Sequence, residues 1–92
     1  MAERITLTAA QAAAATSAGA ATNMGGARCV QVYHSAGTTA RLITVQKVDE
    51  TVVGTVTSHT GGNITYIEKA PDEEIFAAHA EIFFTPVLYH NA

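Results

Sequence analysis

The sequence of 92 residues contains one cysteine, no tryptophan and few charged residues. An intramolecular disulfide is excluded because Cys29 stands alone, so the chain is not a disulfide-stapled scaffold. We interpret Cys29 as a small buried apolar residue. Charged side chains make up 14% of the chain, and the five basic residues are scattered. We expect no nucleic-acid partner, because a groove that follows phosphates needs clustered Lys and Arg.

Long apolar runs are also missing. No stretch approaches the roughly 18–20 apolar residues that a membrane span needs, so we expect no membrane partner. The first residues include Glu3 and lack a long hydrophobic core, which makes them a poor signal peptide. We expect one small soluble domain, made in the cytoplasm. A chain of this size builds only a modest core, and its scarce charge suggests a surface covered by neighbours in an assembly.

The sequence shows no motif for catalysis, cofactor binding or metal binding. Ser35 and Ser58 lack the G-x-S-x-G pattern, and the glycine-containing stretches form neither G-x-G-x-x-G nor a P-loop. Cys29 and His34 are five residues apart on one expected strand, so they project to opposite faces. We therefore expect a protein that is not an enzyme, with no cofactor and no metal site. The histidines lack zinc-ligand spacing and are interpreted as scattered side chains: His34, His59, His79 and His90.

Alternating apolar and polar residues predict a series of β-strands from residue 28 onward. Turn residues separate these strands at intervals of about ten residues, and the glycines at 61–62 give a strong turn signal. This rhythm is typical of an all-β sandwich or barrel. The four expected strands are RCVQVYHS (28–35), ARLITVQKV (40–48), TVVGTVTSH (51–59) and ITYIEK (64–69).

The last third of the chain is compatible with a helix or with two strands. Pro71 and the acids after it suit the start of a helix. However, the segment EIFFTPVLYH is rich in β-branched and aromatic residues, and Pro86 would break a helix there. We favour a turn at 70–74, a short strand near 75–78, and a final strand over about 82–89, with Pro86 at an edge or a bulge. In the helical alternative, one face would carry Ile75, Phe76, His79, Ile82 and Phe83.

Four acidic residues lie close together in the segment EKAPDEE, residues 68–74. A calcium loop would need alternating oxygen ligands and usually a glycine, and this segment has neither. Pro71 suits a turn. We interpret the acids as a solvated corner between two apolar strands, where they also discourage pairing with unwanted chains.

The N-terminal part of the chain differs in composition from the rest. Residues 8–27 are alanine-rich and nearly uncharged, and no regular apolar stripe marks a helix. Ile5 and Leu7 alternate with threonines, which indicates a short strand. We expect residues 1–26 to form a strand and an arm that orders on a partner, and residues 27–92 to form the sandwich domain. The predicted fold is an all-β, Ig-like or jelly-roll sandwich of about seven strands with an extended N-terminal arm.

Three stretches of the sequence resemble a known group of proteins. They are GGARCVQVYHSAGTTARLITV, GTVTSHTGGNITYIEKAPDEEIFA and FFTPVLYH, and together they cover about residues 25–90. The pattern resembles the short β-rich structural proteins of tailed bacteriophages, particularly those of cyanobacteria and related aquatic hosts. The likeness is carried mostly by Gly54, Gly61, Gly62, Lys69, Ala70 and Pro71.

The resemblance implies a virion component without catalytic activity. The main expected role is that of a capsid decoration or cement protein, bound to the major capsid protein or other virion proteins and to further copies of itself. A neck or tail protein is the alternative. The residues themselves leave open a small carbohydrate- or receptor-binding β module, with Tyr33, Tyr66 and Tyr89 as the available tyrosines. The expected interface residues are Ile5, Leu7, Met24, Phe83 and Phe84.

Overall fold

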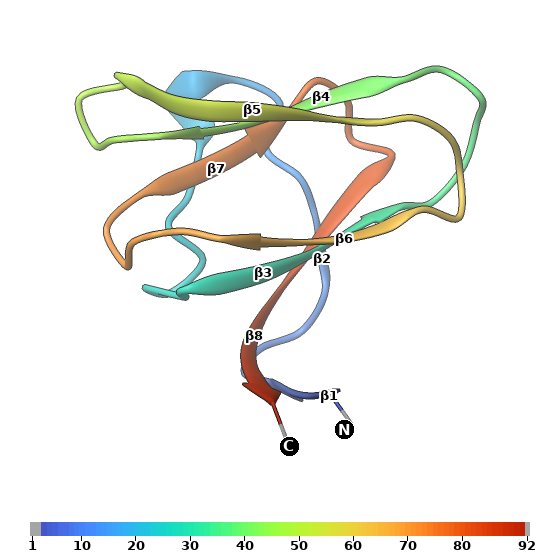
Figure 1. Cartoon of the computed structure of the whole chain (residues 1–92). Helices are drawn as coiled ribbons and strands as arrows, with labels where there is room; N and C mark the ends of the chain where they lie inside the picture. Colours follow the sequence, from blue (N-terminus) through green and yellow to red (C-terminus); the bar gives the residue numbers. More distant parts are fainter. Residues whose placement is uncertain (1–2, 92) are drawn as a thin grey trace.

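The chain folds into two antiparallel β-sheets that face each other (Figure 1). The computed structural model describes residues 3–91, and the side chains of residues 5–88. The expected all-β sandwich is confirmed, with eight strands in the described residues. These are β1 (Glu3–Leu7), β2 (Ala12–Ala13), β3 (Cys29–His34), β4 (Arg41–Gln46), β5 (Val52–Ser58), β6 (Ile64–Glu68), β7 (Glu74–Ala77) and β8 (Ile82–Asn91), with a 3₁₀ turn, η1 (Ala18–Ala20), between β2 and β3.

The sheets differ in size. The larger sheet has the strand order β1-β8-β3-β6, and the short β2 also pairs with β8. The smaller sheet has the order β5-β4-β7. The expected glycine turn joins β5 to β6. β5 is an edge strand of the smaller sheet, and β6 is an edge strand of the larger one. One side of the sandwich is therefore bounded by β5 and β6, and the opposite side by β7 and by the short strands β1 and β2, which pair with β8.

Alternate residues of the facing strands fill the space between the sheets. Val30 and Val32 of β3 meet Ile43 of β4 and Ile75 of β7, and each of the four is at most 1% exposed. Burying such a side chain contributes roughly 1.5–3 kcal/mol relative to leaving it in water. This is the period-two pattern that the sequence predicts for strands with one buried face. The buried cluster contains Ala14, Val30, Val32, Ile43, Val45, Ile75, Ala77, Ile82 and Phe84.

The segment after residue 69 contains a turn and two strands, and no helix. The turn closes with Glu73 N donating to Ala70 O over 3.0 Å, and Pro71 lies at its second position. β7 and β8 then follow, so the strand interpretation is confirmed over the helical alternative. Ile75 and Ala77 alternate into the core, which only an extended backbone achieves at this spacing.

Pro86 lies in β8, which is not an edge strand. β8 pairs with β3 on one side and with β1 and β2 on the other. The proline is accommodated at a break on the second side, because β1 pairing ends at Leu7 opposite Val87 and β2 pairing resumes at Ala12 opposite Phe84. The carbonyl of Pro86 still accepts from the backbone of Thr8 at 3.1 Å. The missing donor of Pro86 thus falls where the ladder is already interrupted.

The N-terminal segment is extended, as expected, but it packs on its own sandwich. Ala14 N donates to Ile82 O over 2.8 Å in the larger sheet, and Ala77 N donates to Ala15 O over 2.9 Å in the smaller one. Thr22 then pairs with Ile75 on the outer side of β7. The arm predicted to order only on a partner therefore closes one side of the sandwich by joining the edges of the two sheets.

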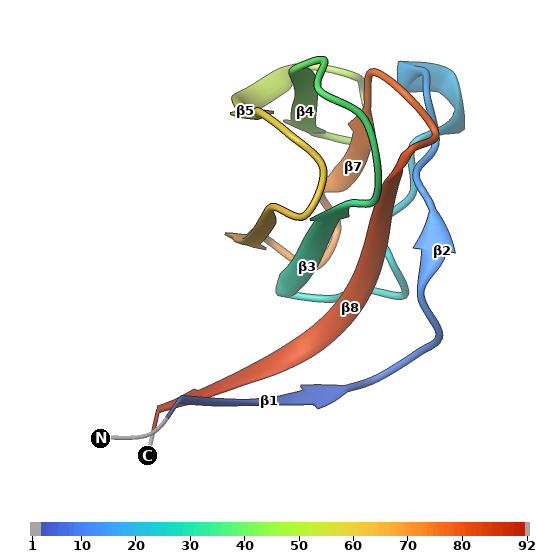
Figure 2. The ribbon, with the colours of Figure 1, turned by 90° about the vertical axis from the view of Figure 1, so that its right-hand side faces the viewer.

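A two-stranded ribbon extends from the body of the sandwich. β1 pairs with residues 87–91 of β8, and β3 reaches along β8 only as far as Val87. Figure 2 shows β1 and the end of β8 leaving the sandwich together, with both chain ends at the far end of the ribbon.

Candidate functional site

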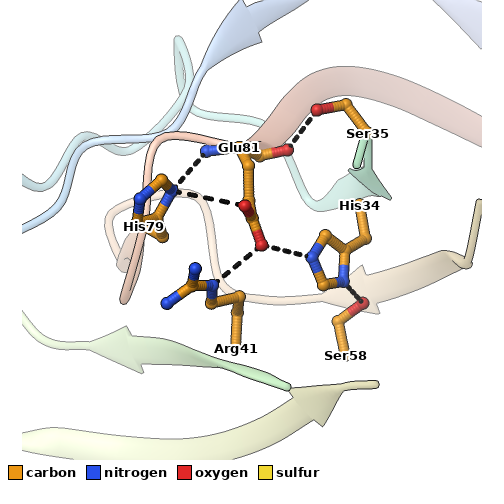
Figure 3. A network of polar contacts seen from close by, with 6 residues as sticks. All are labelled: His34, Ser35, Arg41, Ser58, His79 and Glu81. Atoms are coloured by element: carbon orange, nitrogen blue, oxygen red, sulfur yellow. Dashed lines mark hydrogen bonds and ion pairs between the residues drawn. The ribbon is translucent and has the colours of Figure 1, made fainter. Parts of the chain in front are cut away.

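A network of polar side chains joins the two sheets at one end of the sandwich (Figure 3). His34 ends β3 and Glu81 directly precedes β8, so both belong to the larger sheet. Arg41 begins β4 and Ser58 ends β5, and both belong to the smaller sheet. The four residues meet because their antiparallel strands begin or end at the same end of the fold.

Glu81 is the centre of this network. Its Oε2 lies 2.6 Å from His34 Nε2 and accepts a hydrogen bond from Arg41 Nε at 2.8 Å. On the other side of the imidazole, Ser58 Oγ lies 3.2 Å from His34 Nδ1. The backbone carbonyl of Glu81 accepts a bond from Ser35 Oγ at 2.7 Å. A chain of hydrogen bonds therefore runs from Ser58 through His34 to Glu81 and Arg41.

Burial fixes the donor and acceptor roles in this chain of contacts. The side chain of His34 is 0% exposed, and Ser58 is 4% exposed. An ionised carboxylate only accepts, so in the neutral imidazole Nε2 carries the proton and donates to Glu81. Nδ1 then accepts from the hydroxyl of Ser58. All the polar atoms of the buried imidazole are satisfied, as a buried polar group requires.

The network also sets the charge of Glu81. The hydrogen bond from Arg41 and then that from His34 lower the pKa of Glu81 from 4.5 to about 2. Both bonds favour the ionised carboxylate, and the Arg41 guanidinium adds electrostatic attraction. Glu81 is therefore charged over most of the pH range and holds the guanidinium and the imidazole in place.

Two turns cover this end of the sandwich. Gly62 N donates to His34 O over 2.7 Å, and Gly61 N donates to Gly37 O over 2.8 Å. Gly61 is required by the close approach, because a Cβ there would lie 3.0 Å from the backbone of Ala36. The turns predicted at 36–39 and 60–63 thus pack against each other beside the imidazole.

The order serine, histidine, carboxylate is that of a hydrolase triad. In a triad the hydroxyl attacks a substrate, which must reach the serine. Here the hydroxyl of Ser58 is buried, and Glu81 is shared with Arg41. The geometry instead suits a polar connection between two sheets, in which a buried hydrogen-bonded network specifies one packing arrangement.

Sequence reasoning missed this network. His34 was interpreted as one of four scattered histidines, Ser58 only as a serine without a catalytic motif, and Glu81 was given no role. The hydrogen-bonded partners are 24 and 47 residues apart. Strand pairing alone brings them together. His59 is exposed and lies outside the network, and His79 accepts a bond from the backbone of Glu81 at 3.0 Å.

A second buried polar group anchors the loop before β3. Lys69 is only 7% exposed, and its Nζ donates to Ala27 O at 2.7 Å and to Asn23 O at 2.9 Å. Burial lowers the pKa of Lys69, and the nearby charges of Glu73 and Asp72 oppose that shift. The ammonium group therefore holds the N-terminal segment against the corner at 68–74.

The acidic corner is partly solvated. Asp72 is exposed, whereas Glu73 and Glu74 are half-buried and each accepts a hydrogen bond. Glu73 Oε1 accepts from Ala70 N at 2.8 Å, which closes the turn. Glu74 Oε1 accepts from the buried Gln46 at 3.1 Å. Among the described residues, no group of three His, Cys, Asp or Glu side chains is placed to hold a metal ion.

The expected interface residues lie in different environments. Leu7 is 64% exposed on the ribbon, and Ile5 is half-buried there. Met24 packs against the core, and Phe83 is half-buried on the outer face of the larger sheet. Phe84 is 1% exposed and belongs to the core, so it is corrected from an interface residue to a packing residue.

Comparisons with known proteins add no assignment. No family model, curated protein or solved structure matches the chain. Over residues 3–91, no helix is long and apolar enough to cross a membrane.

Proposed function

We propose that the chain is a non-enzymatic structural protein of a phage virion that binds the capsid as a decoration or cement protein. In that role it stabilises the particle through contacts with the major capsid protein and with further copies of itself. The sequence resemblance supplies the virion assignment. The fold supports the proposal because it leaves apolar side chains of the β1–β8 ribbon exposed to solvent in a single copy.

The observation that carries the proposal is the ribbon formed by β1 and the end of β8. Leu7 and Leu88 are 64% and 51% exposed on it, and their register places them on opposite faces of the ribbon. Beyond Val87, β1 is the one strand that pairs with β8 among the described residues. An isolated two-stranded hairpin is marginally stable in water, so contact with a neighbouring subunit would stabilise this one.

The buried network agrees with a structural role. Its hydroxyl, imidazole and carboxylate hold the sheets together, and Ser58 offers no accessible nucleophile. We propose that stability, and not chemistry, is what these residues contribute.

The proposal is tested on purified particles of the phage that encodes the chain. Mass spectrometry should find the chain in many copies, and separation of heads from tails should leave it with the heads. Recovery with the tails would show that the protein belongs to the neck or tail and not to the capsid. Absence from the particles would overturn the proposal.

Re-binding of the purified chain to particles that lack it tests the ribbon. Leu7→Asp and Leu88→Asp should each weaken binding. Val48→Asp is the matched control, because Val48 is 67% exposed in the turn between β4 and β5, outside the ribbon. Equal binding by all three variants would show that the ribbon is not the contact.

One observation favours a second function, a carbohydrate- or receptor-binding module. The register places Ile64, Tyr33 and Phe83 in one row across the outer face of the larger sheet. In the next row, Gln31 Nε2 donates to Tyr66 Oη over 3.0 Å. A face with aromatic rings and a side-chain amide resembles sugar-binding surfaces in its chemistry. A glycan array with the native chain, with Tyr33→Ala and Tyr66→Ala as controls, tests this alternative.

A further inference from the structure

The side of the sandwich opposite the N-terminal segment is open. On the closed side, Thr22 pairs with β7 and β2 pairs with β8, so both edges there are occupied. On the open side, β5 has β4 as its one neighbour in the described residues. In Figure 2, β5 lies at the outer margin of the smaller sheet, with β4 between it and β7. A free edge of this kind is a template for another strand.

The open edge has an irregularity at Val53, between the pairs Val45–Gly54 and Gln46–Val52, but it lacks the charged residues and proline that commonly prevent strand pairing. Residues 51–67, which contain β5, the glycine turn and all of β6 except its last residue Glu68, have no Asp, Glu, Lys or Arg and no proline. Natural edge strands are commonly protected by charged residues, especially lysine, or by proline. Six of the seven residues of β5 are exposed, and Ser58 is the buried one.

A row of core side chains ends at this edge. Ala77 of β7 pairs with Ile43 of β4, and Ile43 pairs with Val56 of β5. Ala77 and Ile43 are 0% and 1% exposed, but Val56 is 41% exposed. The apolar row therefore reaches the margin of the sheet, where its last side chain, Val56, is exposed to solvent.

The backbone of β5 shows which groups are available for pairing. Ala78 N donates to Leu42 O, so the backbone groups of Ile43 turn the other way, toward Val56. In an antiparallel ladder these directions alternate. The N–H and C=O groups of Thr55 and Thr57 therefore point out of the smaller sheet. Both lie in the regular part of β5, because the irregularity in the ladder falls near Val45 and Gln46.

We propose that a second copy of this chain pairs with β5 in antiparallel fashion about a two-fold axis at Val56. Val56 then lies opposite the same residue of the partner copy, and Thr55 lies opposite Thr57. The outward backbone groups of both threonines become hydrogen-bonded, and the two valines join the apolar rows of the two copies. The two smaller sheets become one continuous sheet. The inference rests on the proposed assembly in repeated copies and names one of its contacts.

Self-pairing is favoured over pairing with a different chain by the composition of the edge. A two-fold contact places a surface against itself, so any charge on it would face a like charge. The uncharged β5 avoids that repulsion. The Thr–Thr pairs are a favourable cross-strand combination, and the Val–Val contact buries apolar surface.

Sedimentation of the isolated chain over a range of concentrations tests the proposal without any particle. The native chain should form dimers, and Val56→Lys should be monomeric at concentrations at which Val48→Lys still dimerises. Thr55→Pro should also be monomeric, and its proline removes no bond to β4 because that N–H points outward. Circular dichroism checks that each variant is folded.

Cysteine cross-linking tests the register. In a background with Cys29→Ala, Val56→Cys should form a disulfide-linked dimer under mild oxidation, because Val56 meets its own copy at a closely spaced pair. Thr55→Cys should not, because its partner is Thr57. Mixing Thr55→Cys with Thr57→Cys chains should restore the cross-link.

A native chain that stays monomeric would overturn the proposal, as would dimers that persist unchanged in Val56→Lys and Thr55→Pro. Pairing of β5 with a different chain, shown by cross-linking from Val56→Cys to another virion protein only, would also overturn it. None of these results decides whether the chain is a virion protein, because that question is answered by its presence in purified particles.

Discussion

His34 Nε2 lies 2.6 Å from Glu81 Oε2, and this contact, extended to Ser58 and Arg41, joins the two sheets at one end. The carboxylate of Glu81 is in direct contact with the fully buried imidazole of His34. Because Ser58 and Arg41 of the smaller sheet bond to His34 and Glu81 on the larger sheet, the packing of the sandwich and the charge of Glu81 depend on each other.

The stability of the chain should fall as the pH drops below about 4.5. The pKa of Glu81 is lowered from 4.5 to about 2 in the folded chain. Between these values the unfolded chain binds the proton first, so acidification favours unfolding, and the contribution of Glu81 is complete only above the higher value. Thermal melts between about pH 6 and pH 2 measure this slope. Glu81→Gln should flatten it, whereas Glu50→Gln, at an exposed turn, should leave it unchanged.

Replacing the buried imidazole should be costly. His34→Leu removes the contacts to Glu81 and Ser58 and leaves the Ser58 hydroxyl buried without its partner. We expect a loss of about 1–3 kcal/mol in the free energy of unfolding. His59→Leu, at an exposed position of the neighbouring turn, should change it by less than about 0.5 kcal/mol. Equal effects of the two changes in urea denaturation would contradict the structural role of the network.

The acids of the corner should not be equivalent. Asp72→Asn should be neutral within about 0.5 kcal/mol, because Asp72 is exposed. Glu74→Ala should cost about 1 kcal/mol, because the buried Gln46 loses an acceptor and keeps only the carbonyl of Ala18. Calcium and a chelator should give the same melting temperature for the native chain. A calcium-dependent shift that disappears in Asp72→Asn would instead indicate a cation site.

Truncation should separate the two parts of the N-terminal segment. A chain without residues 1–8 loses β1 and should keep a cooperative thermal transition. A chain without residues 1–26 also loses the buried Ala14 and the bond from Ala77 N to Ala15 O, so its transition should be broad or absent. Identical melts of the two truncated chains would show that residues 9–26 are not needed for the folded sandwich. That result would support the prediction from the sequence that residues 1–26 form an arm apart from the sandwich domain.

The order of the strands along the chain follows from local sequence. The strands predicted from RCVQVYHS (28–35) and ARLITVQKV (40–48) match β3 and β4 within one or two residues, and the glycines at 61–62 fall in the turn before β6. These features depend on neighbouring residues only, because a period of two and a positive φ at Gly62 are properties of the local backbone.

Sequence reasoning was less successful with the N-terminal segment and Pro86. Alanine-rich residues 9–26 carry little apolar pattern, yet Ala14 is buried, because backbone bonds to Ile82 and from Ala77 hold residues 14–15 against both sheets. Pro86 suggested an edge strand, and its place in the interior is possible only because the β1 and β2 pairings leave a gap beside it. Both outcomes depend on strands distant in the sequence.

The all-β character, the strand positions, the turns and the alternation that fills the core all depend on residues close together in the chain, so they can be predicted from the sequence. Which strands are neighbours depends on the folded arrangement, and so do the closed side of the sandwich, the free edge and the contact of Glu81 with His34. Their separation of 47 residues carries no local signal, because the contact exists only after β3 and β8 have paired and the smaller sheet has packed over them.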